Sequence, residues 1–182
     1  MDYDPTWPQR FEQLRSELAH SLASAGAPVV TIEHVGSTSV PGLAAKPVID
    51  CDIVVAQGDV AAASIALVGL GFRPLGELGI PQRWAFREPQ RLAGTNTDVV
   101  VDGCLSLRNH IAVREVLRSD LALRDEYAAV KRKVGASARD IDEYVRGKND
   151  VVQRLLVAAG VTEAERAAIN ANQVPGQDAL PR

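Results

Sequence analysis

The sequence has few cysteines, no long apolar run and no excess of positive charge, and each shortage argues against a class of protein. The two cysteines, Cys51 and Cys104, lack metal-ligand spacing and indicate reduced thiols rather than a disulfide. The first residues lack the basic and apolar segments of a secretory signal, and no apolar run is long enough to span a membrane. We therefore expect a cytoplasmic protein without a membrane partner.

Nucleic acid is not an expected partner either. The formal net charge is -3 at pH 7, so a nucleic acid would need a local basic patch. With 182 residues, of which 46% are hydrophobic, the chain can bury a full core. We expect one domain over residues 1–160 and a mobile tail over residues 161–182, where apolar periodicity is lost. The sequence leaves the oligomeric state open.

Hydrophobic periodicity predicts an α/β (α+β) fold, a small mixed sheet with packed helices and a helical C-terminal half. The last helix is expected over about residues 138–160, with Ile141, Tyr144 and Val145 on its apolar face. Segments 83–87 and 97–101 are expected to form a hairpin. The elements expected before them are a helix ending near Gly26, strands over 29–33 and 48–55, and a helix over 60–70.

The segment HVGSTSVPGLAAKPVIDCDIVV is the most informative part of the chain. Asp50 and Asp52 lie in an apolar run typical of a buried strand, and the period of two places both carboxylates on one face. Two adjacent carboxylates repel each other unless a cation or protons neutralise them. We therefore predict a divalent metal site, for Mg²⁺ or Mn²⁺, although a structural role at a solvated strand edge is the alternative.

The residues around this pair extend the prediction. Gly36 and Ser37 follow a predicted strand and suit a phosphate, because glycine lets the backbone come close and serine adds a donor. Asp98, in the later strand TNTDVVVD, is the best candidate for a third carboxylate and metal ligand. Asp102 is a rival on the same face, but it precedes Gly103 and better suits a turn.

Four basic residues are candidates for binding nucleotide phosphates. Lys46 lies in the loop between the Gly-Ser pair and the aspartates, and a solvated loop lysine is its alternative. Arg83 and Arg87 share a strand face if no bulge intervenes, and their guanidinium groups suit a triphosphate or a carboxylate. Lys148 lies among apolar neighbours on the last helix, where it needs an anion or must extend to solvent.

Two further residues favour a structural role. His34 directly precedes Val35 and Gly36, and we interpret it as a hydrogen-bonded histidine that supports the loop. Cys51 lies between the two aspartates and therefore points to the opposite face of the strand, where it fills the core.

The order of the Gly-Ser pair, the Asp-x-Asp strand and the later acid resembles the nucleotidyltransferase superfamily, which includes DNA polymerase β and kanamycin nucleotidyltransferase. More narrowly, HVGSTSVPGLAAKPVIDCDI resembles the signature of the GrpB family. The segments YDPTW, GCLSLRNHIAVREVLR and EYVRGKNDVVQRLL also resemble that family, so the likeness covers nearly the whole chain except the tail. It departs at Asp98, where relatives more often carry a histidine.

The resemblance implies a minimal nucleotidyltransferase fold and metal-dependent transfer of a nucleotidyl group. We therefore expect an enzyme that uses a nucleoside triphosphate, ATP in the first instance, with a small molecule as the acceptor. Two alternatives stay open. One is an ATP-dependent ligase that activates a carboxylate as an adenylate for amide formation, and the other is a catalytically inactive nucleotide-binding module.

Overall fold

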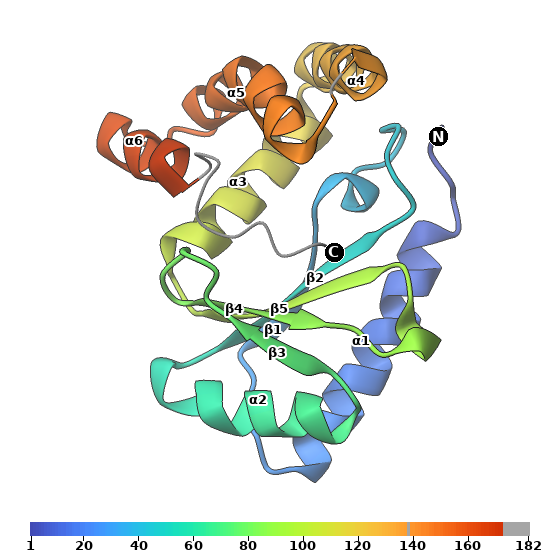
Figure 1. Ribbon diagram of the computed structural model, residues 1–182, viewed down its shortest axis with the longest axis vertical. Coiled ribbons are helices and arrows are strands. Elements are labelled where there is room, and N and C mark those ends of the chain that lie inside the picture. Colours follow the sequence, from blue (N-terminus) through green and yellow to red (C-terminus); the bar gives the residue numbers. More distant parts are fainter. Residues whose placement is uncertain (138, 173–182) are drawn as a thin grey trace. The chain divides into compact units, whose positions relative to one another are not determined.

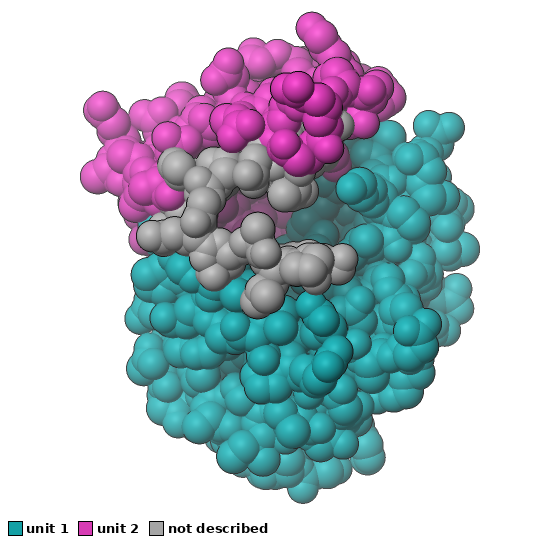
Figure 2. Space-filling view, viewed as in Figure 1, with its two compact units in different colours: residues 1–107 teal, residues 108–182 magenta. Residues whose placement is uncertain are grey.

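The structure is a computed structural model that describes residues 1–137 and 139–172 (Figure 1). Its chain forms two compact units, residues 1–107 and residues 108–182, which Figure 2 colours separately. The units are described one at a time. The expectation that residues 1–160 form a single domain stays a prediction.

The first unit is built on a five-stranded mixed sheet with the strand order β1-β2-β5-β4-β3. β2 and β5 pair in parallel, and the other neighbours pair antiparallel. Together with the helices, this confirms the predicted α/β fold class. The strands are β1 (Thr31–Val35), β2 (Ile49–Val55), β3 (Arg73–Gly76), β4 (Arg83–Arg87) and β5 (Thr95–Val101).

Two helices, α1 (Trp7–Ser24) and α2 (Val60–Gly69), contact each other and pack against the sheet on one side (Figure 1). Helical spacing places one apolar stripe of α1 in the core, which is why this helix forms here. α2 ends just before Gly71, whose φ of +93° suits glycine at a helix end. The buried residues of α1 are Trp7, Phe11, Leu14, Leu18 and Leu22.

The loops of this unit contain three short 3-10 helices, and β4 and β5 form the predicted hairpin. β3 was not predicted, because its sequence RPLG contains proline and glycine, which are typical of turns. It is an edge strand with a bulge, and such positions tolerate both residues. The 3-10 helices are η1 (Ser37–Ser39), η2 (Gln57–Asp59) and η3 (Gln90–Leu92).

The second unit is helical, as predicted for the C-terminal half. Helices α4 and α5 pack closely, since a Cβ built at Gly147 would lie 2.7 Å from a methyl carbon of Val134. The side chain of Asp140 caps α5 by accepting a hydrogen bond from the backbone N–H of Glu143 at 2.7 Å. No helix within the described ranges is both long and apolar enough to cross a membrane. The helices are α3 (Leu105–Ser119), which begins in the last residues of the first unit, α4 (Leu121–Ser137), α5 (Ile141–Ala158) and α6 (Glu163–Asn172).

Helix α6 lies within residues 161–182, where a mobile tail was expected and no helix was predicted. The mobility of this segment stays a prediction. Thr162 and Glu165 form a reciprocal cap, in which the N–H of each residue donates to the side chain of the other at 3.1 and 3.3 Å. The hydrogen bonds from Thr162 also lower the pKa of Glu165. The remainder of the predicted tail, residues 173–182, and the side chains of Ile141, Tyr144 and Val145 lie outside the described part of the structure.

Candidate functional site

The predicted acids lie together on the face of the sheet opposite Cys51. Asp50 and Asp52 are two residues apart on β2 and therefore share a face. The parallel pairing of β2 with β5 places Asp98 directly beside Asp52, and Asn96 directly beside Asp50. Asp52 is 2% exposed and Asp98 is 6% exposed, so both carboxyl groups lie in a largely water-excluded environment. The predicted grouping of the three acids on one face is therefore present.

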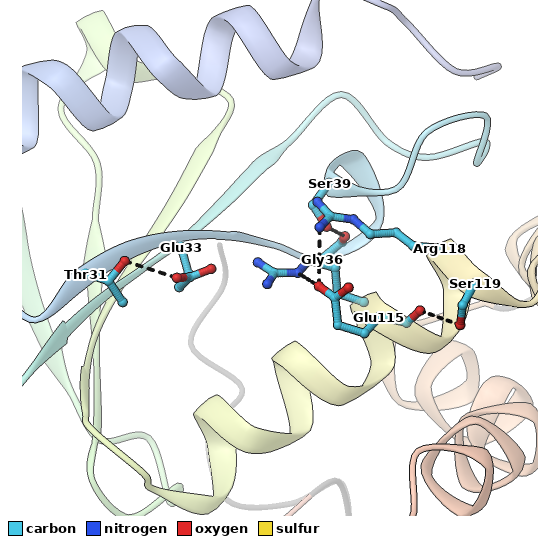
Figure 3. Close-up of polar contacts among 8 residues, drawn as sticks. Thr31, Glu33, Gly36, Ser39, Glu115, Arg118 and Ser119 are labelled. Carbon is cyan, nitrogen blue, oxygen red and sulfur yellow. Dashed lines mark hydrogen bonds and ion pairs between the residues drawn. The ribbon is translucent and has the colours of Figure 1, made fainter.

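The Gly-Ser turn contacts the first of these acids. Gly36 ends β1 with a φ of +69°, and a Cβ built on it would lie 2.1 Å from Oδ2 of Asp50. Only glycine fits, because any side chain would overlap the carboxylate. The hydroxyl of Ser39 donates to the carbonyl of Gly36 at 2.6 Å and closes the short helix that Ser37 begins (Figure 3). The turn at Gly36 and the side chain of Asp50 are therefore in direct contact.

Asn96 fixes the other side of the same carboxylate. Its side-chain amide donates a hydrogen bond to Oδ1 of Asp50 at 3.0 Å. The sequence alone indicated no role for this position. No local pattern would have assigned one, because the contact depends on the parallel register of β2 and β5.

Glu33 is an additional acid that sequence reasoning missed. It lies on β1 directly opposite Asp52, so it faces the same side of the sheet. The hydroxyl of Thr31 donates to its carboxylate at 3.0 Å, as Figure 3 shows. The signal that would have found it is the antiparallel pairing of β1 with β2, which is not visible in either strand alone.

The acids also affect the buried thiol of Cys51, which lies between Asp50 and Asp52 along β2. The pKa of Cys51 is raised well above its ordinary value, first by burial and then by the surrounding carboxylates. Cys51 is a free, buried cysteine, which confirms its interpretation as a core residue. The contributing carboxylates, in decreasing order, are Asp52, Asp98, Asp50 and Glu33. The carboxylates are therefore close enough to the thiol of Cys51 to disfavour its ionised form.

An arginine lies beside the third acid. Nε of Arg83 is 3.6 Å from Oδ2 of Asp98, and both side chains are largely buried. The register of β4 with β5 contains no bulge, and it places Ala85 directly opposite Asp98. Arg83 and Arg87 flank Ala85 at a spacing of two and therefore share the face of the acids, as predicted. Their role in binding phosphate stays a prediction.

The acids suit a single Mg²⁺ ion held by two carboxylates better than a metal site built from all three acids. Within the described residues, no group of three or more His, Cys, Asp or Glu side chains is arranged to hold a metal ion. Asp98 pairs with Arg83, whereas Asp50 and Asp52 share a strand face beside the glycine turn. Magnesium is commonly bound by one or two carboxylates and completed by substrate phosphates, which is the set that these two aspartates offer. A role for Asp98 as a metal ligand stays a prediction.

The contacts of His34 support the turn at Gly36 and are typical of a structural histidine. Its ring stacks on Phe11 of α1, with centroids 4.5 Å apart. The Thr38 hydroxyl donates to the carbonyl of Val48 at 2.9 Å, so its oxygen is left to accept from Nε2 of His34 at 3.1 Å. This chain of contacts links η1 to the residues just before β2, and it confirms the structural interpretation of the histidine.

The remaining candidates lie further from the acid pair or in the other unit. Lys46 is an exposed residue of the loop before β2. Lys148 is half-buried on α5, in the second unit, and its expected pairing with a phosphate or an acid stays a prediction. Asp102, the rival third acid, is exposed in the turn that follows β5, as its neighbour Gly103 indicated.

Comparisons with known proteins agree with the resemblance seen in the sequence. A family model described as GrpB protein matches residues 1–157. A UPF0157 protein of Halalkalibacterium halodurans is 32% identical over 166 residues, which cover 89% of this chain and 82% of that protein.

Among solved structures, the conserved protein GrpB from Enterococcus faecalis has a TM-score of 0.74 and 28% identity, and the match covers 87% of this chain and 95% of that one. Cid1, named for RNA terminal uridylyl transferase activity, has a TM-score of 0.48 and 14% identity, over 72% of this chain and 44% of that one. A likeness as low as that to Cid1 does not identify an activity. The family match covers most of the sequence, and the chain belongs to the GrpB family.

Proposed function

We propose that this protein is a magnesium-dependent nucleotidyltransferase that moves a nucleoside monophosphate, AMP from ATP, to a small-molecule acceptor. The register of β2 with β5, which places Asp98 beside Asp52, is the observation that supports it best. Gly36 also contacts Asp50, so the glycine turn lies beside the acids. A turn that phosphates can approach, a pair of carboxylates and a third acid are the parts that such a transfer needs.

The nucleotide end of the reaction uses the glycine turn and the acid pair. Gly36 leaves room for the carboxylate of Asp50, which any side chain would overlap, and Ser37 adds a hydroxyl donor for a phosphate oxygen. Asp50 and Asp52 would hold Mg²⁺, and a bound ion would supply positive charge against the triphosphate and the departing pyrophosphate. We assign Lys46 to the phosphates as a point charge.

The acceptor end uses the third acid. The hydroxyl oxygen of the acceptor attacks the α-phosphorus, and the bond from that phosphorus to the bridging oxygen breaks. Pyrophosphate leaves with the bonding electrons, and the carboxylate of Asp98 takes the hydroxyl proton. The Arg83 guanidinium, whose Nε is 3.6 Å from Oδ2 of Asp98, would hold this carboxylate in position.

Binding of the nucleotide is the first test. Calorimetry with Mg²⁺ and a nonhydrolysable ATP analogue should show binding to the wild-type protein and loss of most of it in Asp52→Asn. Asp102→Asn is the matched control, because Asp102 follows the neighbouring strand but is exposed in a turn. Thermal unfolding without ligand establishes that each variant is folded. If the wild-type protein shows no magnesium-dependent binding of any nucleoside triphosphate, the proposal is wrong.

Turnover is the second test. Release of pyrophosphate is measured with each common nucleoside triphosphate across a panel of hydroxyl and amine acceptors, and a nucleotidylated product should accumulate. Nucleotide binding without pyrophosphate release under all of these conditions would favour an inactive nucleotide-binding module instead.

An ATP-dependent ligase is a second candidate, and it is favoured by the arginines that share the face of the acids. Arg83 lies beside Asp98, and Arg87 lies four residues further along the same strand face. A guanidinium group binds a carboxylate in a two-point geometry, which suits an acid that becomes an adenylate. Amide formation from a carboxylate and an amine, with release of AMP as well as pyrophosphate, would distinguish this reaction from stable nucleotidyl transfer.

A further inference from the structure

The sign of the charge changes across the face of the sheet that carries the acids. The carboxylates lie on β1, β2 and β5, whereas arginines occupy the same face on β4 and β3. Arg73, on the edge strand β3, is directly opposite Arg87 and therefore shares its face. Arg73 is exposed and Arg87 is half-buried. The fold thus presents a positive edge beside the acids, which the sequence did not reveal because β3 was not predicted.

Arg73 and Arg87 concentrate two positive charges in directly opposed positions of the sheet. Side chains that face each other across an antiparallel pair have Cβ atoms about 5 Å apart, and like charges there destabilise the sheet. An anion between the two guanidinium groups would reverse the sign of this interaction. Each group can also donate two parallel hydrogen bonds to a phosphate or a carboxylate.

The position of Arg73 separates this pair from the triphosphate. One row across the sheet runs from Val35, which precedes Gly36, through Asp50 and Asn96. Continuing the register of β4 by one residue places Arg87 next in that row, followed by Arg73. Neighbouring strands are about 4.8 Å apart, so four intervals separate the ends of the row by roughly 19 Å. A triphosphate held at the Gly36 turn, with its α-phosphate at the acids, would therefore lie at the end of the row away from Arg73.

We propose that Arg73 and Arg87 form a subsite for an anionic group, a phosphate or a carboxylate, carried by the acceptor. The subsite lies on the side of Asp98 away from the glycine turn, where an acceptor would approach the α-phosphate. This assignment of acceptor class rests on the proposed nucleotidyl transfer, whereas the binding of an anion by the two arginines does not.

The experiment uses two separate titrations. Inorganic phosphate is titrated calorimetrically into the wild-type protein and into Arg73→Gln, first alone and then with Mg²⁺ and a nonhydrolysable ATP analogue present. The analogue occupies the glycine turn and leaves the arginine pair as the site that is measured. Arg15→Gln is the matched control, because Arg15 is exposed on α1 and its ion pair is with Glu12 of the same helix. A parallel titration with acetate distinguishes a carboxylate from a phosphate.

Arg73→Gln should weaken the binding of phosphate or of acetate roughly tenfold, the loss expected for a charge-assisted contact, and should leave the affinity for the magnesium-bound analogue unchanged. Arg15→Gln should leave both unchanged. Equal anion binding by the wild-type protein and Arg73→Gln would overturn the subsite. Failure of the analogue to bind any of the proteins would overturn the proposed function instead, and the phosphate titration without analogue would still decide the subsite.

Discussion

The sheet face that carries the acids has an acid side, on β1, β2 and β5, and an arginine side, on β4 and β3, and the two differ in burial. On the acid side, Asp50 is held between Gly36 and the amide of Asn96, and Asp52 is almost fully buried. On the arginine side, Arg73 is exposed on an edge strand that contains a bulge. Groups that must hold a metal ion and phosphates in one geometry benefit from a rigid setting, whereas an exposed edge can accept acceptors of different shapes. We therefore expect the chemistry on the acid side and the selection of the acceptor on the arginine side.

The strongest test of the rigid side is Gly36→Ala. The new methyl group would overlap the carboxylate of Asp50, and alanine is also disfavoured at a φ of +69°. We expect the free energy of unfolding to fall by about 2–4 kcal/mol and magnesium-dependent nucleotide binding to be lost. Denaturant unfolding and calorimetry measure the two effects.

Gly26→Ala is the matched control for this variant. Gly26 has a similar φ of +66°, but a Cβ there would meet no atom within 4 Å. It should lose only the conformational part, about 1 kcal/mol, and it should retain nucleotide binding. Equal losses in the two variants would show that the contact between Gly36 and Asp50 contributes nothing.

Arg83→Met tests the boundary between the acid side and the arginine side, because Arg83 lies beside Asp98. Removing the guanidinium group takes a cation away from Asp98, whose side chain is 8% exposed, and we expect a loss of about 1–3 kcal/mol of unfolding free energy. Arg87→Met, on the same strand face, should cost less, because Arg87 lies beyond the residues paired with Asp98. Unfolding in urea compares the two variants, and a larger loss for Arg87→Met would place the boundary elsewhere.

Asn96→Ala removes the hydrogen bond to Asp50 and leaves the carboxylate itself in place. We expect a loss of about 1–2 kcal/mol in unfolding free energy and weaker binding of the magnesium-bound ATP analogue. Thr95→Val is the control, since its hydroxyl donates to the carbonyl of Leu92 outside the site. Weaker nucleotide binding in Asn96→Ala but not in Thr95→Val would show that Asn96 orients the acid. Unchanged binding in both would contradict that role.

Sequence patterns predicted the features that depend on local spacing. The period of two placed Asp50 and Asp52 on one face, and the hairpin of residues 83–87 and 97–101 was correct. Features that depend on which strands become neighbours were not accessible. Glu33 enters the site only through the pairing of β1 with β2, and Asn96 only through the parallel pairing of β2 with β5.

Two further elements were missed for different physical reasons. β3 was hidden by the proline and glycine that an edge strand tolerates, and Arg73 was missed with it. α6 has few large apolar residues, with Ile169 buried, so its sequence offers little apolar surface by which to predict a helix. The reciprocal cap of Thr162 and Glu165 was nevertheless present in the sequence as a signal for the start of a helix.

The arginine side gives the smallest expected effect on stability, and of the opposite sign. Arg73→Gln removes one of two opposed like charges on an exposed edge, so the free energy of unfolding should stay constant or rise by a few tenths of a kcal/mol in the absence of anion. Adding inorganic phosphate should stabilise the wild-type protein more than the variant, since an anion that binds the native state raises its stability. Urea unfolding with and without phosphate measures both terms. A clear loss of stability in Arg73→Gln without phosphate would mean that Arg73 holds the edge strand in place. The two sides of the face would then differ less in rigidity than their burial indicates.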